Sequence, residues 1–143
     1  MAHNRECGID ITAGSALIER CDVERNFRCG VVVRNGATPL VARNRIHHDN
    51  DAGVLVLDSG AGSIIENDIF GNRNAGLISR TGAHPFVYRN KINENRDGCL
   101  VLEAGGGVFE QNDVYVCLPS TVCLQLSAFN CLPSTVRLQL FAL

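Results

Sequence analysis

The sequence contains no tryptophan, and aromatic residues of all kinds make up only 6% of its 143 positions. A sugar-binding site commonly offers exposed aromatic rings on which the ligand stacks. Phe27, Phe70, Tyr88 and Tyr115 are too few and too scattered along the chain to predict such a platform. The composition therefore disfavours carbohydrate binding, without excluding it.

Neither sign of charge is in large excess, since 13 lysines and arginines stand against 15 aspartates and glutamates. No basic block of the kind that neutralises phosphates occurs, and no apolar run follows a positive segment at the start of the chain. We expect an intracellular protein, cytoplasmic or nuclear, that binds neither nucleic acid nor a membrane.

Seven cysteines are present, but none belongs to a C-x-x-C pair. Structural zinc sites generally use two closely spaced ligand pairs, so the sequence predicts no metal site and no cofactor. Because no secretory signal is visible, the cysteines are expected to be reduced thiols.

Internal repeats organise most of the chain. Each unit opens with apolar and β-branched residues, breaks at small or turn-forming residues, and resumes with a second apolar run. The units cover residues 8–29, 30–52, 53–75 and 76–98, and a partial fifth unit, CLVLEAGGGVFEQNDVY, covers residues 99–115. The spacing of 22 or 23 residues and the absence of helical periodicity favour a coil of short strands.

We therefore predict an all-β chain, a single-stranded right-handed parallel β-helix of about five rungs over residues 1–115. A rung is one turn of this coil, and adjacent rungs should hydrogen-bond about 4.8 Å apart. Residues 116–143 carry a different, 14-residue tandem repeat, CLPSTVCLQLSAFN followed by CLPSTVRLQLFAL. Its alternating VCLQL and VRLQL segments are predicted to form two strands that cap the coil, and the alternative is a disordered tail.

Residues at equal offsets in successive units should lie over one another, and four such columns are apolar. We expect their side chains to fill the core. The columns are Ile9, Val31, Val54, Leu77 and Leu100; Ile11, Val33, Val56, Ser79 and Leu102; Ile18, Val41, Ile64, Val87 and Phe109; and Val23, Ile46, Ile69, Ile92 and Val114.

Two polar columns support the same alignment. Cys21 is followed by Asn44, Asn67, Asn90 and Asn112, which we interpret as a structural asparagine ladder at a sharp bend, with amides bonded from rung to rung. The next column alternates in the sign of its charge, which favours pairing between neighbouring rungs. Its members are Asp22, Arg45, Asp68, Lys91 and Asp113.

Adjacent histidines, His47 and His48, stand beside Asp49, Asn50 and Asp51 and suggest a metal or acid/base site. The same residues align with the polar turns at 70–74 and 93–97 of the next units. Neighbouring side chains on an extended chain point to opposite sides, so the two imidazoles are not expected to share a metal. We predict a solvated turn.

Some parallel β-helices are enzymes that cleave or epimerise acidic polysaccharides, with carboxylates gathered in a groove between long loops. Here the unit length hardly varies, which leaves no inserted loop to wall a groove. Asp22, Asp68 and Asp113 each stand beside a cation in their column. We therefore predict no catalytic residue.

An outward-facing column in the first strand is apolar, which is unusual for a solvated face. It comprises Val32, Leu55, Ile78 and Val101, after Asp10 in the first unit. Strand propensity and shielding by neighbours explain it in one way, and a docking strip for a protein partner explains it in another. Thr12, Arg34, Leu57, Arg80 and Glu103 would then form a mixed border beside this strip.

The segments RNRIHHDNDAGVLVLDSGAGSIIENDIFGNRNAG and GAHPFVYRNKINENRDG resemble the β-helix repeats of the F-box-only proteins ten and eleven, which are substrate-receptor subunits of cullin-based ubiquitin ligases. The resemblance covers residues 1–115 and carries no catalytic residue. It implies a protein-interaction module that holds a ubiquitination substrate, although the chain shows no segment resembling an F-box. The alternatives are a carbohydrate-binding or lyase/epimerase-like protein, and a non-functional fragment.

We expect the sequence to begin in mid-rung, because Asn4 to Cys7 matches Asn26 to Cys29. An uncapped rung exposes strand edges, so end-to-end self-association is a further expectation.

Overall fold

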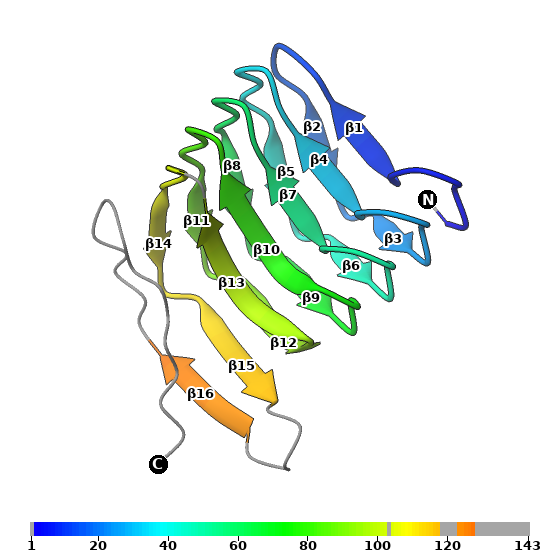
Figure 1. The fold of residues 1–143 in the computed structure, drawn as a ribbon, viewed down its shortest axis with the longest axis vertical. Helices are drawn as coiled ribbons and strands as arrows, with labels where there is room; N and C mark the ends of the chain where they lie inside the picture. Colours follow the sequence, from blue (N-terminus) through cyan, green and yellow to red (C-terminus); the bar gives the residue numbers. More distant parts are fainter. Residues whose placement is uncertain (1, 103, 118–122, 128–143) are drawn as a thin grey trace.

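The structure is a computed structural model that describes residues 2–102, 104–117 and 123–127, with the backbone alone for 99–102, 116–117 and 123–127. The chain winds through short strands that lie in successive layers along one axis (Figure 1). In the part of the chain that the structure describes, no helix is long and apolar enough to cross a membrane.

Three strands make up each complete rung, and equivalent strands of successive rungs pair in parallel to form three sheets. The first sheet comprises β1 (Ile9–Ile11), β4 (Val31–Val33), β7 (Val54–Val56), β10 (Ala75–Arg80) and β13 (Asp97–Leu102). The second comprises β2 (Leu17–Glu19), β5 (Leu40–Ala42), β8 (Ser63–Ile65), β11 (Phe86–Tyr88) and β14 (Val108–Glu110). The third comprises β3 (Asp22–Glu24), β6 (Arg45–His47), β9 (Asp68–Phe70), β12 (Lys91–Asn95), β15 (Asp113–Cys117) and β16 (Cys123–Ser127). The predicted all-β coil is confirmed.

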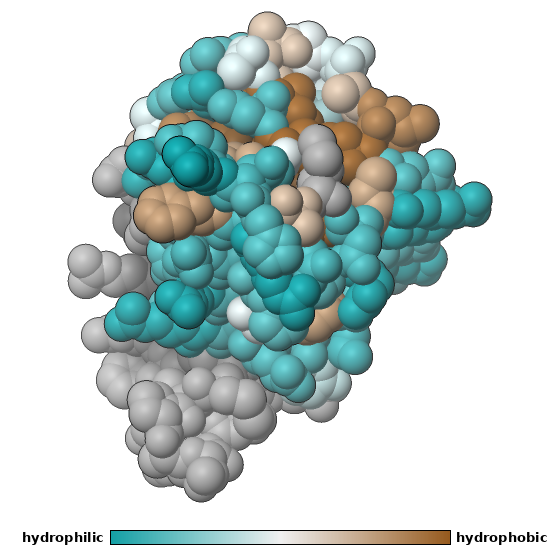
Figure 2. Space-filling model, turned by 90° about the vertical axis from the view of Figure 1, so that its right-hand side faces the viewer, coloured by the Kyte–Doolittle hydropathy of each residue, from teal (hydrophilic) through white to brown (hydrophobic). Residues whose placement is uncertain are grey.

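The core lies inside the coil and is built from the predicted apolar columns. Val31, Val54 and Leu77 of the first sheet are fully buried, as are the central members of the other columns. The first rung is less covered, because Ile11 and Ile18 each keep 8% exposure and Ile9 is half-buried. Seen from the side on which β1 lies, apolar atoms gather near the top of the molecule among hydrophilic ones (Figure 2).

The register of the last rung differs from the prediction. Strand β13 pairs with β10 so that Leu77 lies beside Cys99, Ile78 beside Leu100, and Ser79 beside Val101. The predicted alignment of Leu100 with Leu77, of Val101 with Ile78 and of Leu102 with Ser79 was therefore wrong by one residue. The physical reason is that the spacing between the last two rungs is 22 residues already at their first strands, since Ala75 of β10 pairs with Asp97 of β13.

The tail contributes one described strand. Residues 123–127 form β16, which pairs antiparallel with β15 from Cys117↔Cys123 to Asp113↔Ser127. The first of the two predicted tail strands, VCLQL, thus overlaps a strand at the end of the third sheet. The second, VRLQL, lies outside the described residues.

Candidate functional site

The asparagine column forms a continuous ladder at the bend between the second and third sheets. Asn67 illustrates the pattern, because its Oδ1 accepts hydrogen bonds from the main-chain N and Nδ2 of Asn44 at 2.9 and 3.0 Å. Its Nδ2 donates to Asn90 Oδ1 and to Val41 O, both at 2.9 Å. Asn90 continues the chain to Asn112, and all four side chains are buried. These buried amides satisfy main-chain groups that the bend would otherwise leave without partners.

A single left-handed residue produces this bend in every rung. Arg20, Arg43, Glu66, Arg89 and Gln111 immediately precede the ladder positions and have φ between 51° and 55°. An L-residue in this conformation costs about 1–2 kcal/mol, which the ladder hydrogen bonds help to offset.

A second ladder runs along the other end of the third sheet, and the sequence interpretation missed it. Its members, at spacings of 22 or 23 residues, are Asn4, Asn26, Asp49, Asn72 and Asn95. Here too the preceding residue is left-handed at Arg25, His48, Gly71 and Glu94. The equal spacing of these asparagines was the signal that could have found the ladder, but the histidines drew attention to the turn instead.

Asp49 is the member of the second ladder that is not an amide. Its side chain is fully buried, and its Oδ1 accepts hydrogen bonds from the main-chain N and Nδ2 of Asn26 at 2.8 and 2.9 Å. Its Oδ2 is buried without a hydrogen-bond partner. Burial raises the pKa of Asp49 to about 6, although the hydrogen bonds from Asn26 oppose the shift.

Only one of the two histidines is solvated as the predicted turn requires. His48 is exposed, but His47 keeps only 6% exposure, bonds Asp22 Oδ1 through Nε2 at 2.7 Å and stacks on Phe70. The two Nδ1 atoms lie 2.7 Å apart, so the expectation that the rings point to opposite sides was wrong. The cause is the φ of 57° at His48, which turns its side chain back. Among the described residues, no three or more histidine, cysteine, aspartate or glutamate side chains are grouped so that they could hold a metal ion.

The charge-alternating column has the predicted register. In the strand register, Asp22 lies beside Arg45, Arg45 beside Asp68, Asp68 beside Lys91, and Lys91 beside Asp113. Arg45 Nη1 lies 3.1 Å from Asp22 Oδ2, and Asp22 also bonds His47. The carboxylate nearest to the histidines is therefore engaged in structural contacts.

The outward column of the first sheet packs into a small apolar cluster outside the coil. Val32 and Ile78 keep only 6% and 8% exposure, and Leu55 is half-buried. Shielding comes from the last residues of three units, Cys29, Ala52 and Ala75, which lie in the same cluster, with Cys7 and Leu57 packed against it. Val101, the fourth predicted strip residue, lies at the register of Ser79 instead.

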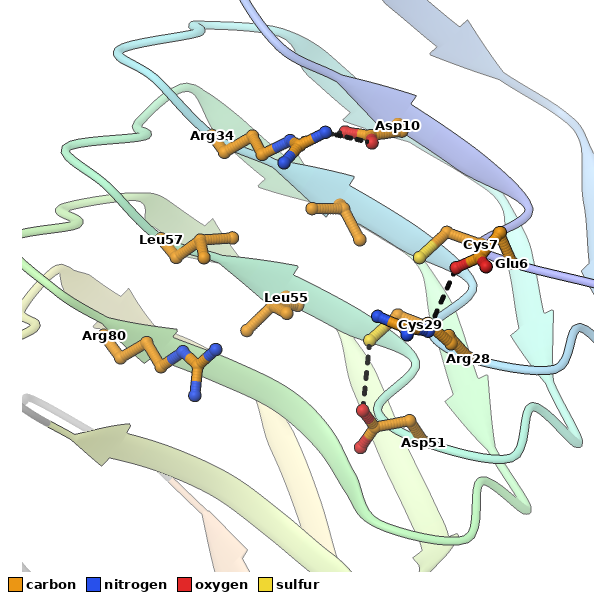
Figure 3. A pocket seen from close by; sticks show the side chains of 11 residues that line it. Glu6, Cys7, Asp10, Arg28, Cys29, Arg34, Asp51, Leu55, Leu57 and Arg80 are labelled. Carbon is orange, nitrogen blue, oxygen red and sulfur yellow. Dashed lines mark hydrogen bonds and ion pairs between the residues drawn. The ribbon is translucent and has the colours of Figure 1, made fainter.

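Over this cluster lies a hollow of about 370 Å³. Val32, Leu55 and Leu57 supply its apolar surface. Figure 3 shows Arg34, Leu57 and Arg80 at one end of the strands, with Cys7, Cys29 and Asp51 at the other and Leu55 between them. The predicted border column thus supplies three residues of the rim.

The charges around the hollow are unequally neutralised. Arg34 binds Asp10 through Nε and Nη2 at 3.0 and 2.7 Å, and Arg28 Nε lies 3.0 Å from Glu6 Oε2. Among the cations that line the hollow, Arg80 is the one for which the described residues supply no ion pair, and its buried Nε has no hydrogen-bond partner. Arg80 therefore leaves a positive charge beside an apolar surface.

The opposite end of the hollow is acidic and contains thiols. Asp51 Oδ1 accepts a hydrogen bond from Asn74 Nδ2 at 2.8 Å, and Cys29 Sγ lies 3.7 Å from Asp51 Oδ2. Burial, reinforced by Asp51, raises the pKa of the Cys29 thiol far above its ordinary value. The thiol consequently stays protonated and acts as a weak donor rather than as a nucleophile.

The family model described as "right handed beta helix region" matches residues 2–117. The chain belongs to the right-handed β-helix family. No curated protein and no solved structure matches it.

This β-helix also carries apolar and aromatic side chains on the outer face of its second sheet, which the sequence interpretation did not single out. Phe86 and Tyr88 project from β11 with ring centroids 5.6 Å apart and an interplanar angle of 16°. Leu17, Leu40 and Val108, in the column of Phe86, are exposed. The spacing of Phe86 and Tyr88, two residues apart on one strand, was the signal that could have indicated a shared outer face.

Proposed function

We propose that this β-helix is a protein-interaction module and that the hollow on its first sheet docks an extended segment of a partner protein. The segment would place an aliphatic side chain over Leu55 and Leu57 and an acidic side chain against Arg80. The observation that carries the proposal is the Arg80 guanidinium, which has no ion pair among the described residues and lies beside the apolar side chains of the hollow, whereas Arg28 and Arg34 are each paired with an acid. Arginine beside an apolar pocket is a frequent anchor in protein interfaces.

The resemblance to the F-box-only proteins suggests the class of partner. In that case the docked segment belongs to a protein destined for ubiquitination, and the β-helix acts as the substrate-holding part of a ligase receptor. The family match supports the fold that this role requires and is equally compatible with other roles of β-helices.

A selection with displayed random peptides of about seven residues tests the docking proposal. We expect the protein to enrich sequences in which Asp or Glu accompanies an aliphatic residue. The Arg80→Gln variant should bind a selected peptide roughly 10-fold or more weakly, because a hydrogen-bonded charge contributes about 1.5–3 kcal/mol.

The matched control exchanges the acid of the peptide for its amide. That exchange should weaken binding to the wild-type protein but leave binding to Arg80→Gln nearly unchanged, which isolates the ion pair as a coupling energy. Melting curves of the variant check that it remains folded. Selected peptides without an acid, or equal loss on both proteins, would overturn the proposal.

Carbohydrate binding is the second candidate, and one observation favours it. The stacked rings of Phe86 and Tyr88 form an aromatic pair on an outer face, although the Arg89 guanidinium lies 4.8 Å from the centroid of the Tyr88 ring and covers part of it. Binding to an oligosaccharide array that disappears in Phe86→Ala and persists in Arg80→Gln would favour this role over peptide docking.

A further inference from the structure

We infer that Asp49 is held as a neutral, protonated acid within the second ladder at mildly acidic pH, where an ordinary aspartate is ionised, so that the stability of this β-helix depends on the protonation of one buried carboxyl group. This inference is independent of the proposed docking function.

The asparagines that follow Asp49 in the ladder define what its position requires. Asn72 Nδ2 donates to Asn95 Oδ1 at 2.9 Å and to Ile46 O at 3.3 Å, and Asn95 Nδ2 donates to Ile69 O at 2.9 Å. Each ladder side chain therefore supplies a donor to the main-chain oxygen of the preceding rung, and Asn72 also supplies one to the next side chain.

Asp49 has an oxygen where its neighbours have an NH₂ group. The register aligns Val23 with Ile46, so Val23 O and Asn72 Oδ1 occupy the acceptor positions for residue 49. Asn72 Oδ1 already accepts a hydrogen bond from the main-chain N of Asp49 at 3.0 Å. An ionised Asp49 would turn a carboxylate oxygen toward two other acceptors, and its Oδ2 indeed has no hydrogen-bond partner.

A proton on Oδ2 resolves this conflict. The resulting hydroxyl donates to one of the two acceptors and restores the rung-to-rung pattern, while Oδ1 keeps the hydrogen bonds from Asn26. The packing favours the neutral form further, because the side chain is fully buried, and burying an uncompensated charge is costly.

The charged groups around Asp49 act in opposite directions. His47 on the same rung favours the ionised acid when it is protonated, and Glu24 on the preceding rung disfavours it. On the following rung, the main-chain N of Asp49 donates to Asn72 Oδ1, and its main-chain O accepts from the main-chain N of Arg73 at 3.0 Å; both partners are uncharged groups. Desolvation remains the largest influence and raises the pKa to about 6 from an ordinary value of 3.8.

The direction of the pH dependence follows from this shift. Below the ordinary pKa of 3.8, Asp49 is protonated in both the folded and the unfolded chain, and its full contribution to stability is present. As the pH rises, the unfolded chain ionises first, so stability is lost progressively until the folded group has also ionised above about 6.

Two measurements on the full chain test the inference. A carbon NMR titration of the Asp49 carboxyl group should show a midpoint near pH 6, far above that of an ordinary aspartate. Denaturation of the Asp49→Asn variant should show a higher melting temperature than the wild type at about pH 7, with a smaller loss of stability between about pH 4 and pH 7. The amide supplies the missing donor without a charge.

Asp51→Asn is the matched control, because Asp51 lies in the same turn, is only half-buried and accepts its hydrogen bond from Asn74. This variant should keep the pH dependence of the wild type. An Asp49 titration midpoint near 4, or the same pH slope in Asp49→Asn as in the wild type, would overturn the inference. The titration of the wild-type protein decides the question even where a variant fails to fold.

Discussion

At the scale of single residues, the fold depends on buried amides that close the bends. Asn67 makes four ladder hydrogen bonds, two accepted by Oδ1 and two donated by Nδ2. Replacing it would leave both donors of Asn44, together with Asn90 Oδ1 and Val41 O, without those partners. A buried polar group left without a hydrogen bond costs about 1–3 kcal/mol, so the loss of these hydrogen bonds outweighs any gain in strand propensity.

We therefore predict that Asn67→Ala lowers the free energy of unfolding by about 2–4 kcal/mol, measured by chemical denaturation. Asn50→Ala serves as the control, because the Asn50 side chain is exposed in the turn after β6. The control should change stability by less than about 0.5 kcal/mol. Equal, small effects of the two substitutions would show that the ladder does not hold the bend.

The residue scale also shows what the sequence could predict. Asn44, Asn67, Asn90 and Asn112 were recognisable because an identical side chain recurs at each rung. The second ladder was harder to recognise because one member, Asp49, is not an asparagine and stands beside His47 and His48, where the three residues suggest a metal or acid/base site. Pattern alone could not reveal the burial of Asp49 or the contact of the histidines, since both depend on a left-handed backbone at His48.

At the scale of elements, the rungs pack tightly where one unit ends and the next begins. Gly53 opens β7's rung, and a Cβ there would lie 2.6 Å from Ile69 Cγ2 and 2.7 Å from Asn72 Nδ2. Gly30 and Gly76 face equivalent contacts on their own rungs. The first strand of each rung can therefore approach the second ladder only through a residue without a side chain.

We predict that Gly53→Ala lowers the free energy of unfolding by about 1–3 kcal/mol or more, through overpacking against the ladder. Gly106→Ala is the matched control, because its Cβ would have a nearest neighbour at 3.6 Å. Thermal melts of both variants measure the difference. A Gly53→Ala protein as stable as Gly106→Ala would contradict the packing described for this rung.

Element register was predictable in most rungs and failed in the last. The first four strands of the first sheet, β1, β4, β7 and β10, follow the offsets of the repeat, but β13 lies one residue away from the expected alignment. The alignment kept a 23-residue spacing at the first strand, whereas Asn90 and Asn112 already showed 22. Both faces of this strand are apolar in sequence, so hydrophobic alternation could not correct the error.

At the scale of the whole molecule, one coil supplies both stability and surface. The inward columns form the core, the two ladders hold two of its corners, and the outer face of the first sheet carries the hollow with Arg80. The border of the hollow was recognisable as a mixed column, but the sequence could not show that Arg80 lacks an ion pair among the described residues. Arg34 pairs with Asp10 because β1 and β4 lie on adjacent rungs, and only the stacked arrangement shows this.

The central claim is that residues about 23 positions apart lie directly over one another, with their side-chain amides hydrogen-bonded. Proton NMR on the asparagine side-chain amides tests it most directly. The structure predicts nuclear Overhauser contacts from Asn44 to Asn67 and from Asn67 to Asn90, with amide protons that exchange slowly with solvent. Amide protons that exchange rapidly and show contacts only to residues nearby in the sequence would contradict the stacked coil.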